Sequence, residues 1–351
     1  MKAFLHSFLG LVAPPLLIGL LGAFPSTTSA ASAPVEEIRI AVPDLSAGSN
    51  HSGGGVVDVL RDQQLLEKAF ADQGIKVQWS FFKGAGPVIN EAFANGQVDF
   101  AYLGDLAAII GKSSGTDTRL LSGIARNIKS YLGVVPGSGI TDLHSLKGKR
   151  VALFRGTANQ LSFDAAIASQ GLSERDFKVV NLDFNAGNAA IVARQVDATW
   201  GLSNLNALRA RGLVEIPLST NDLGGAGRIQ SVLVGAGAFV DAHPELVTRL
   251  LAAQEQALQW LTREENKDAY IQLVSTLANY PPVILQEDYK DEKLAEVFRS
   301  ELDAEFLAQL QKSVELAAEL RLIRKPFVVT DWAAPRFLEA ATRQPVPVAT
   351  R

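Results

Sequence analysis

The sequence contains no cysteine, which excludes disulfide bonds, thiolate metal sites, a cysteine nucleophile and a lipid-modified N-terminal cysteine. It has only four histidines, and His51, His144 and His243 stand far apart, which argues against a metal hydrolase. We therefore expect no metal ion and no cofactor. Lys and Arg number 33 against 37 Asp and Glu, with no basic block, so a nucleic-acid partner is not expected. With 47% hydrophobic residues the chain can bury a core, and these absences favour a binding protein over an enzyme.

Residues 1–33 have the composition of a cleavable signal peptide. Lys2 is their only charged residue, residues 8–24 are apolar, and small residues follow. Cleavage fits after Ala30 or after Ala33, and the proline that follows the second site favours the first. A membrane anchor is the alternative, but two consecutive prolines interrupt the short apolar stretch. The sequence therefore predicts export to the periplasm, and removal of Lys2 changes the net charge from −4 to −5.

Strand, glycine-containing turn and helix repeat three times between residues 38 and 105. The strands are expected at 38–42, 77–81 and 98–102, and a long helix at about 56–73. This repetition is typical of a parallel α/β sheet.

A second series of strands and helices begins near residue 136, and the glycine-rich stretch 220–227 that follows it is typical of a linker. The C-terminal third is mostly helical, and we expect it to complete the first unit, which has few strands of its own. The sequence thus predicts an α/β protein of two lobes with parallel-rich sheets, joined by a hinge that the chain crosses twice. Lobe 1 comprises residues 34–136 and 226–351, and lobe 2 comprises residues 137–225.

Ligands of open parallel sheets collect at the carboxyl ends of the strands, where helices begin. In this chain the turns at those ends contain glycine, which lets a ligand approach the backbone, and helix N-termini attract anions. Basic residues lie at or near the turns: Lys83, Arg126, Arg155 and Arg228. We therefore expect a small anion between the lobes, in contact with the turns at 46–55, 83–86, 103–105 and 155–159.

Several of these residues also have a simpler interpretation. His51 fits a solvated loop as well as an oxyanion donor, and Asp105 fits a helix N-cap. Arg126 and Arg228 fit surface charges, and Trp200 fits a core. No Ser-His-Asp order, nucleophile elbow or full phosphate-binding glycine spacing is present. It is the recurrence of similar turns in both lobes that favours a binding site.

Eight segments in order resemble the periplasmic substrate-binding proteins of ABC importers for aliphatic sulfonates, taurine and nitrate. They lie at 65–68, 95–101, 103–105, 146–152, 180–182, 196–198, 243–247 and 320–326, within about residues 36–335. The resemblance implies a type II periplasmic-binding-protein fold that closes on its ligand by a hinge. It also implies a monomer that docks on the transmembrane subunits of an ABC permease. The stretch from Trp200 to Asn204, the extra Gly and Ser around His51 and the turn at 83–86 depart from the family pattern.

The turns and the resemblance together indicate the ligand-binding residues. The resemblance implies contacts from the 46–55 loop, from 104–105 and from the helix start at 156–159. The full set of candidates is Ser49, His51, Ser52, Lys83, Gly84, Gly86, Gly104, Asp105, Arg126, Arg155, Gly156, Thr157, Asn159, Asn204 and Arg228. No catalytic residue is expected.

The expected ligand is a small organic oxyanion, either an aliphatic or aryl sulfonate or a sulfate ester. Taurine, nitrate or another small ligand of the same fold is the alternative. Two rival functions share the two-lobed fold. A non-transport enzyme such as a pyrimidine-precursor synthase would need reactive histidine and cysteine. The effector domain of a transcription regulator would need an N-terminal pair of DNA-binding helices where this chain has its leader.

Overall fold

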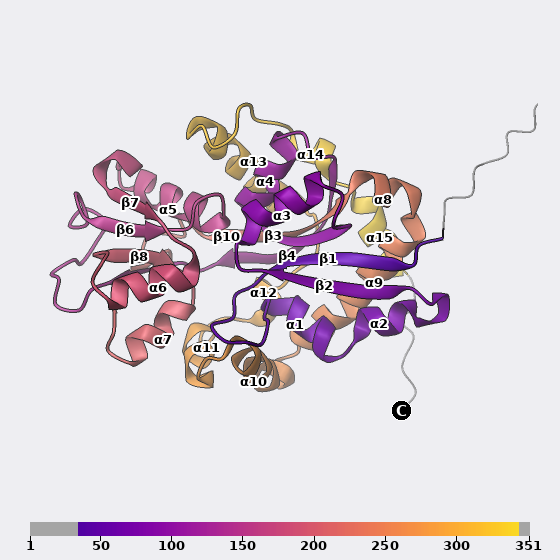
Figure 1. The fold of residues 1–351 in the computed structure, drawn as a ribbon, viewed down its shortest axis with the longest axis horizontal. Coiled ribbons are helices and arrows are strands. Elements are labelled where there is room, and N and C mark those ends of the chain that lie inside the picture. Colours follow the sequence, from indigo (N-terminus) through magenta and orange to yellow (C-terminus); the bar gives the residue numbers. More distant parts are fainter. Residues whose placement is uncertain (1–33, 344–351) are drawn as a thin grey trace, which may run out of the picture. The chain divides into compact units, whose positions relative to one another are not determined.

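The first of two sheets combines strands from both ends of the chain. The computed structural model describes residues 34–343. The sheet order is β2-β1-β3-β10-β4, in which β1, β2 and β3 are parallel and β10 runs antiparallel to both of its neighbours (Figure 1). Its strands are β1 (Glu37–Pro43), β2 (Lys76–Phe82), β3 (Phe100–Gly104), β4 (Thr118–Ile128) and β10 (Ile229–Ala236). Because β10 lies between β3 and β4, the C-terminal part of the chain completes the sheet that the N-terminal part begins.

The second sheet has the order β7-β6-β8-β5-β9, and its neighbouring strands β7, β6 and β8 are parallel. Strand β5 is antiparallel to β8. The strands are β5 (Tyr131–Val134), β6 (Arg150–Leu153), β7 (Lys178–Asn181), β8 (Ala198–Gly201) and β9 (Glu215–Ser219). The helices of this part are α5 (Ala158–Ser169), α6 (Phe184–Val192) and α7 (Asn204–Ala210). A short 3-10 helix covers Glu174–Asp176.

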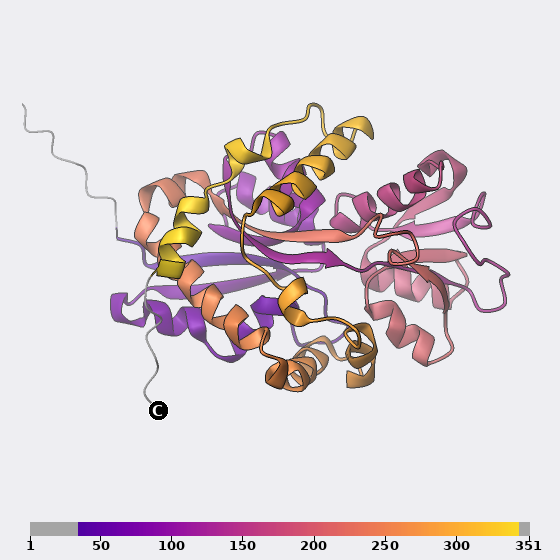
Figure 2. The same ribbon diagram turned by 180° about the vertical axis from the view of Figure 1, so that it is seen from behind.

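Helices cover both faces of the first sheet. One face carries α1 (Gly55–Asp62), α2 (Leu65–Phe70), α9 (Pro244–Leu261) and α15 (Pro335–Arg343), and α15 packs along α9 (Figure 2). The other face carries α3 (Ala85–Ala94), α4 (Asp105–Ser113), α13 (Ala304–Glu319) and α14 (Val329–Trp332). The remaining helices are α8 (Gly237–Ala242), α10 (Lys267–Ala278), α11 (Pro282–Asp288) and α12 (Leu294–Val297), with 3-10 turns at Ala71–Gln73 and Glu264–Asn266.

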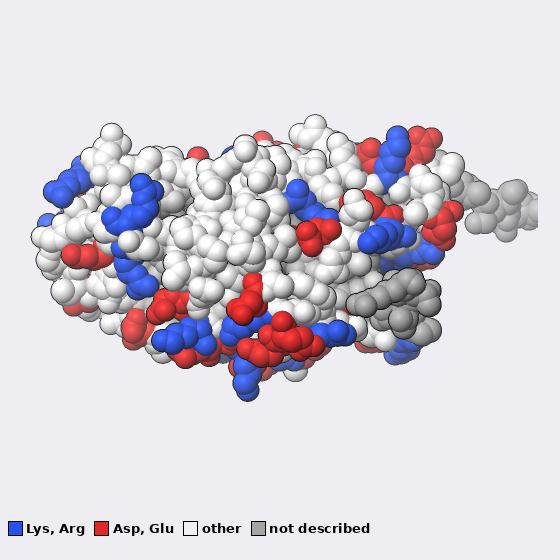
Figure 3. All heavy atoms as spheres, turned by 90° about the horizontal axis from the view of Figure 1, so that it is seen from below, with Lys and Arg blue, Asp and Glu red and all other residues white. Residues whose placement is uncertain are grey.

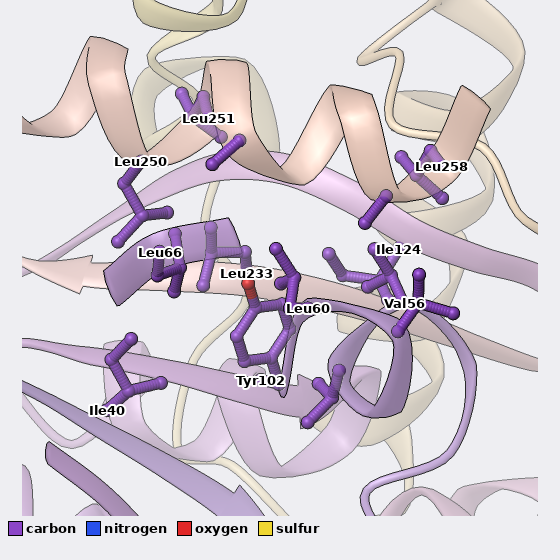
Figure 4. Packing of buried hydrophobic residues seen from close by; sticks show 14 of the residues in the cluster. Ile40, Val56, Leu60, Leu66, Tyr102, Ile124, Leu233, Leu250, Leu251 and Leu258 are labelled. Carbon is purple, nitrogen blue, oxygen red and sulfur yellow. The ribbon is translucent and has the colours of Figure 1, made fainter. Parts of the chain in front are cut away.

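The period of two along β1 explains why this sheet has a core on each side. Ile38 and Ile40 point into the core beneath α1, α2 and α9, whereas Ala41 belongs to the core on the α3 and α4 side. Figure 4 shows the first core, where Leu250 and Leu258 of α9 lie over the sheet and above the ring of Tyr102. The side chains of both cores are buried from water, and this burial stabilises the sheet. The sheet in turn holds the predicted ligand-binding turns at the ends of its strands.

The chain passes between the sheets twice, at two adjacent segments. It leaves β4 at Ile128 and enters β5 at Tyr131, and it returns between β9 and β10. The crossing segments are held together by buried hydrogen bonds, because Thr220 N donates to Ser130 O (3.0 Å) and Ser130 N donates to Thr220 Oγ1 (3.2 Å). The expected two-crossing α/β architecture is therefore confirmed. The first crossing lies earlier in the sequence than the predicted boundary at residue 136, and the division into lobes at 136 and 225 stays a prediction.

The predicted helix at 56–73 is interrupted. Gln64 has left-handed backbone angles (φ 51°, ψ 41°), so the helix breaks there and α2 begins separately at Leu65. The periodicity of Leu60, Leu66 and Phe70 gave no sign of this break, because each of the two short helices still buries its apolar face in the same core.

Two sequence expectations concern features beyond the helices and strands. The predicted signal peptide lies outside the described residues. None of the helices in the described part of the chain is long and apolar enough to cross a membrane.

On the face shown in Figure 3, acidic and basic side chains are interspersed around a broad uncharged area, so this face offers no continuous basic surface.

Candidate ligand-binding site

A cavity of about 240 Å³ lies where the carboxyl ends of the first sheet's parallel strands face the second sheet. The first sheet contributes residues of β1, β3, β4 and β10, and the second lobe contributes the start of α5 and residues around Phe184 and Ser203. Helices α10, α11 and α12 close the remaining side. Most of the lining is apolar or aromatic, as in sites that take organic molecules.

The N-terminus of α5 faces this cavity. Thr157 is its N-cap residue and directs its hydroxyl to Phe154 O (2.7 Å) instead of capping the helix. Among the described residues, the N–H groups of Thr157, Ala158 and Asn159 donate to no protein acceptor. Asn159 is buried and donates from Nδ2 to Trp200 O (2.8 Å), which fixes the first turn. Free N–H groups at the positive end of a 12-residue helix form a site for an anion.

The glycine-rich loop before α1 has its N–H groups already occupied. Asp58 accepts from Ser52 Oγ, from Gly53 N (3.0 Å) and from Gly54 N (3.2 Å). Burial raises the pKa of Asp58 to about 6, although these hydrogen bonds oppose the shift. Gly55 N donates to Tyr270 Oη (3.1 Å). The loop therefore forms a cavity wall, and the start of α5 is the better anion site.

The two lobes touch beside the start of α5. A Cβ atom on Gly104 would lie 2.5 Å from Cβ of Ala158, and one on Gly86 would lie 3.3 Å from Gly156 O. Only residues without a side chain allow β3 and α3 to come this close to α5. The contact holds the α5 N-terminus against the first lobe and closes this edge of the cavity.

The opposite end of the cavity is aromatic and charged. Tyr270, Tyr280, Tyr289 and Phe298 line it, and so do Lys129, Asp288 and Glu292. Lys129 Nζ lies 3.7 Å from Asp288 Oδ1 and 3.3 Å from Glu292 Oε1. Among the described residues that line the cavity, Lys129 is the single Lys or Arg.

Five of the residues predicted from the sequence line the cavity together: Ser52, Gly86, Gly104, Thr157 and Asn159. Gly156 lies directly beside them in the contact between the lobes. These residues come from turns that are far apart in the chain, and the site itself stays a prediction.

The other predicted residues of the first lobe do not line the cavity. His51 and Lys83 both contact Asp44, at 2.8 and 3.1 Å. Burial alone would raise the pKa of Asp44, but hydrogen bonds from His51, Ser46 and Lys83 outweigh it and lower this pKa to about 2. Ser49 is exposed in the same loop, and Gly84 is the N-cap of α3.

The predicted arginines are held by protein partners outside the cavity. Arg126 is buried, donates to Asp303 Oδ2 (2.7 Å) and lies 4.5 Å above the ring of Phe306. Arg155 forms two hydrogen bonds with Glu174, and Arg228 is exposed and donates to Asn221 Oδ1 (2.9 Å). Each guanidinium therefore has a structural partner rather than an open position facing the cavity.

Asp105 and Asn204 also have structural partners. Asp105 is the first residue of α4, and the N-cap is Gly104; its carboxylate accepts from Leu106 N (2.8 Å) and Ser313 Oγ (3.1 Å). Burial raises the pKa of Asp105 to about 6. Asn204 donates to Asn188 Oδ1 (3.0 Å) and lines a cavity of only about 10 Å³.

Sequence reasoning did not identify the charged and aromatic end of the cavity. Lys129 lies in the crossing between the sheets, Asp288 is the last residue of α11, and Glu292 follows shortly after it in the helical C-terminal third. No local motif marks them, because only the return of the C-terminal third to the first sheet brings them to the cavity. In the part of the chain that the structure describes, no three His, Asp or Glu side chains are grouped to hold a metal ion.

Comparison with known proteins gives one family match. The NMT1/THI5-like family model matches residues 69–267, which is more than half of the chain. A Bacillus subtilis protein provisionally named an aliphatic sulfonates-binding protein is 25% identical over 293 residues, covering 82% of this chain and 84% of that protein.

Solved structures share the fold. The periplasmic sulfonate-binding protein SsuA from Methylobacillus flagellatus is 29% identical with a TM-score of 0.75, covering 88% of this chain and 94% of SsuA. The desulfurization enzyme DSZB is 16% identical with a TM-score of 0.63, covering 88% of this chain and 99% of the enzyme. Binding proteins and an enzyme are thus both built on this architecture, so the fold alone does not determine function.

Proposed function

Since the chain belongs to the NMT1/THI5-like family, we propose that it is an exported solute-binding protein that captures a small organic sulfonate or sulfate ester in the cavity between its lobes. In this proposal it delivers the ligand to the transmembrane subunits of an ABC permease. The similar proteins that are described as sulfonate-binding support a solute-binding role, and the ligand class is the finer part of the proposal.

The observation that carries the proposal is the α5 N-terminus, with free N–H groups at one end of an apolar cavity. A sulfonate or sulfate oxygen accepts hydrogen bonds from such N–H groups and is attracted by the positive end of the helix. Thr157 and Asn159 are the two polar residues of this turn that line the cavity. The organic part of the ligand would lie against the apolar wall of β1, β4 and β10.

The size of the cavity favours an organic anion over nitrate. Its volume of about 240 Å³ corresponds to about eight waters at roughly 30 Å³ each, which exceeds what nitrate occupies. Organic sulfonates and sulfate esters are therefore better candidates than nitrate.

In this proposal the lobes close on the ligand and hold it non-covalently, and the protein does not convert it chemically. Gly104 and Ala158 are in contact across the lobes, and in this proposal closure makes this contact and brings the α5 N-terminus to the cavity. The enzyme alternative has a precedent in the fold of DSZB. Against it, the chain has no cysteine, and no histidine lines the cavity in the described part of the chain.

Isothermal titration of the purified protein tests the proposal. Alkyl and aryl sulfonates, sulfate esters, taurine and nitrate are titrated in turn, and we expect saturable binding of sulfonates or sulfate esters and weaker or no binding of nitrate. Asn159→Asp places a negative charge at the α5 N-terminus and should weaken sulfonate binding at least tenfold. Asn204→Asp adds the same charge in the same lobe outside this cavity and serves as the matched control. The absence of a saturable response to every sulfonate and sulfate ester would overturn the ligand assignment.

A further inference from the structure

The charged residues that line the cavity lie together at the end away from α5. Helix α5 packs against α4 and β10, whereas α11, which ends at Asp288, packs against α7 and α10. Lys129, Asp288 and Glu292 carry formal charges that sum to −1. A ligand in this cavity therefore has the free N–H groups of α5 at one end and an excess of negative charge at the other.

In each of the carboxylates of Asp288 and Glu292, only one of the two oxygens has a partner among the described residues. Tyr131 donates its hydroxyl to Asp288 Oδ1, and Lys129 lies beside that oxygen and beside Glu292 Oε1. Within residues 34–343, no hydrogen bond reaches Asp288 Oδ2 or Glu292 Oε2. Neither oxygen is among the buried polar atoms that lack a partner, so both remain accessible. Each can accept a hydrogen bond from a ligand without displacing Lys129.

An aromatic cluster adjoins these carboxylates. The ring centroids of Tyr270 and Phe298 are 5.6 Å apart, those of Tyr270 and Tyr289 are 6.1 Å apart, and those of Tyr289 and Phe298 are 6.2 Å apart. All three residues line the cavity, and Tyr289 follows Asp288 directly in the chain. Aromatic rings beside carboxylates are a chemical combination that recognises alkylated ammonium groups, because the rings attract the cation and contact its methylene groups.

We propose that Asp288, Glu292 and the cluster of Tyr270, Tyr289 and Phe298 bind a cationic nitrogen, and that the ligand is a zwitterionic organic sulfonate. This inference rests on the proposed function. The sulfonate lies at the start of α5, and a protonated amine lies at the opposite end of the same cavity. A simple sulfonate would add a second negative charge to a cavity wall that already has an excess of one, and an ammonium group on the ligand removes this penalty.

Two ligands of the same shape separate the charge effect from size. In 3-(dimethylamino)propanesulfonate a protonated nitrogen stands where 4-methylpentanesulfonate has a CH group. We expect the amino compound to bind at least tenfold more tightly in isothermal titration at pH 7. Equal or tighter binding of the uncharged-tail compound would overturn the zwitterion proposal and leave the proposed function standing. Binding of neither compound, together with no binding of any sulfonate in the series above, would overturn the proposed function as well.

Variants assign the preference to this end of the cavity. Glu292→Gln should remove most of the preference for the amino compound while leaving the affinity for 4-methylpentanesulfonate unchanged or improved. Glu296→Gln is the matched control, because Glu296 is exposed, pairs with Lys293 and does not line the cavity. A Glu292→Gln protein that keeps its melting temperature and its full preference would overturn the role of the carboxylate.

Discussion

Two buried carboxylates hold the loop that precedes α1, and their surroundings move their pKa values in opposite directions. Asp44 receives hydrogen bonds from His51, Ser46 and Lys83, which outweigh the effect of burial and lower its pKa to about 2. Asp58 is more deeply buried, and burial raises its pKa to about 6. His51 and Lys83 thus stabilise the charged form of Asp44 in the loop that precedes α1.

Asp164 should make the protein less stable as the pH rises. Burial and the nearby Glu174 raise the pKa of this α5 residue to about 8, from 3.8 in its unperturbed state. Between these two values the folded chain holds a proton that the unfolded chain releases, so the free energy of unfolding falls as the pH increases from 4 to 8. Asp164→Asn keeps a hydrogen-bond donor beside Glu174 at every pH and should raise the free energy of unfolding by roughly 2 kcal/mol at pH 8.

Urea unfolding of both proteins at pH 5, 6.5 and 8 measures this effect. Asp268→Asn, at an exposed position of α10, provides the control and should leave the pH dependence unchanged. If Asp164→Asn retained the pH dependence of the parent protein, the proton could not be assigned to Asp164.

At the scale of elements, the function depends on how closely α5 approaches β3 and α3. The short distance between Gly104 and Ala158 means that closure leaves no room for a side chain on the β3 side. Ser162 of α5 donates its hydroxyl to Gly227 O, so the same helix is also attached to the second crossing. Helix α5 therefore connects the proposed anion site to the second crossing between the sheets.

Gly104→Val should hold the lobes apart. Its side chain would overlap Cβ of Ala158, whereas φ of −72° at Gly104 suits any residue, so we expect a folded protein with a site that cannot close. The dissociation constant of a sulfonate should rise at least tenfold, about 1.4 kcal/mol. Titration measures the affinity, and small-angle scattering should show a larger radius of gyration with the ligand present. Gly187→Ala, where a Cβ meets no atom closer than 3.5 Å, is the control. Unchanged affinity in Gly104→Val would contradict a role for this contact in binding.

For the whole molecule, the charge balance determines how an anion approaches. The chain has a net charge of −4, and Lys129, the one cationic side chain that lines the cavity within residues 34–343, is already beside two carboxylates. Attraction of an anion is therefore short-ranged and comes from helix ends rather than from the overall field.

Salt should accordingly not slow the binding of a simple sulfonate. Raising NaCl from 20 to 200 mM screens the repulsion between the acidic protein and the anion, so the association rate should stay constant or increase by up to about twofold. Stopped-flow measurement of intrinsic fluorescence at several salt concentrations tests this. A tenfold decrease in the association rate would instead require a basic surface around the cavity.

The sequence allowed the turns of the site to be located, but it did not allow the partners of the charged side chains to be identified. The turns that contain Ser52, Gly86, Gly104 and Thr157 could be located because parallel α/β sheets place such turns at one edge. The guanidinium groups could not be placed, since the sequence does not show that Arg126 of β4 pairs with Asp303, or that Arg155, beside the turn at Thr157, pairs with Glu174.

By itself, the sequence determined the fold class, the order of most strands and helices, and the absence of cysteine chemistry. These properties depend on local periodicity and composition, which are visible along the chain. Only the tertiary structure decided which N–H groups are free and which charges face the cavity. Asp58 accepts hydrogen bonds from N–H groups of the glycine-rich loop, whereas the first N–H groups of α5 have no protein acceptor among the described residues. Asp288 and Glu292 reach the cavity because the C-terminal third of the chain returns to the first sheet, and a contact between residues so far apart in the chain leaves no pattern in either segment.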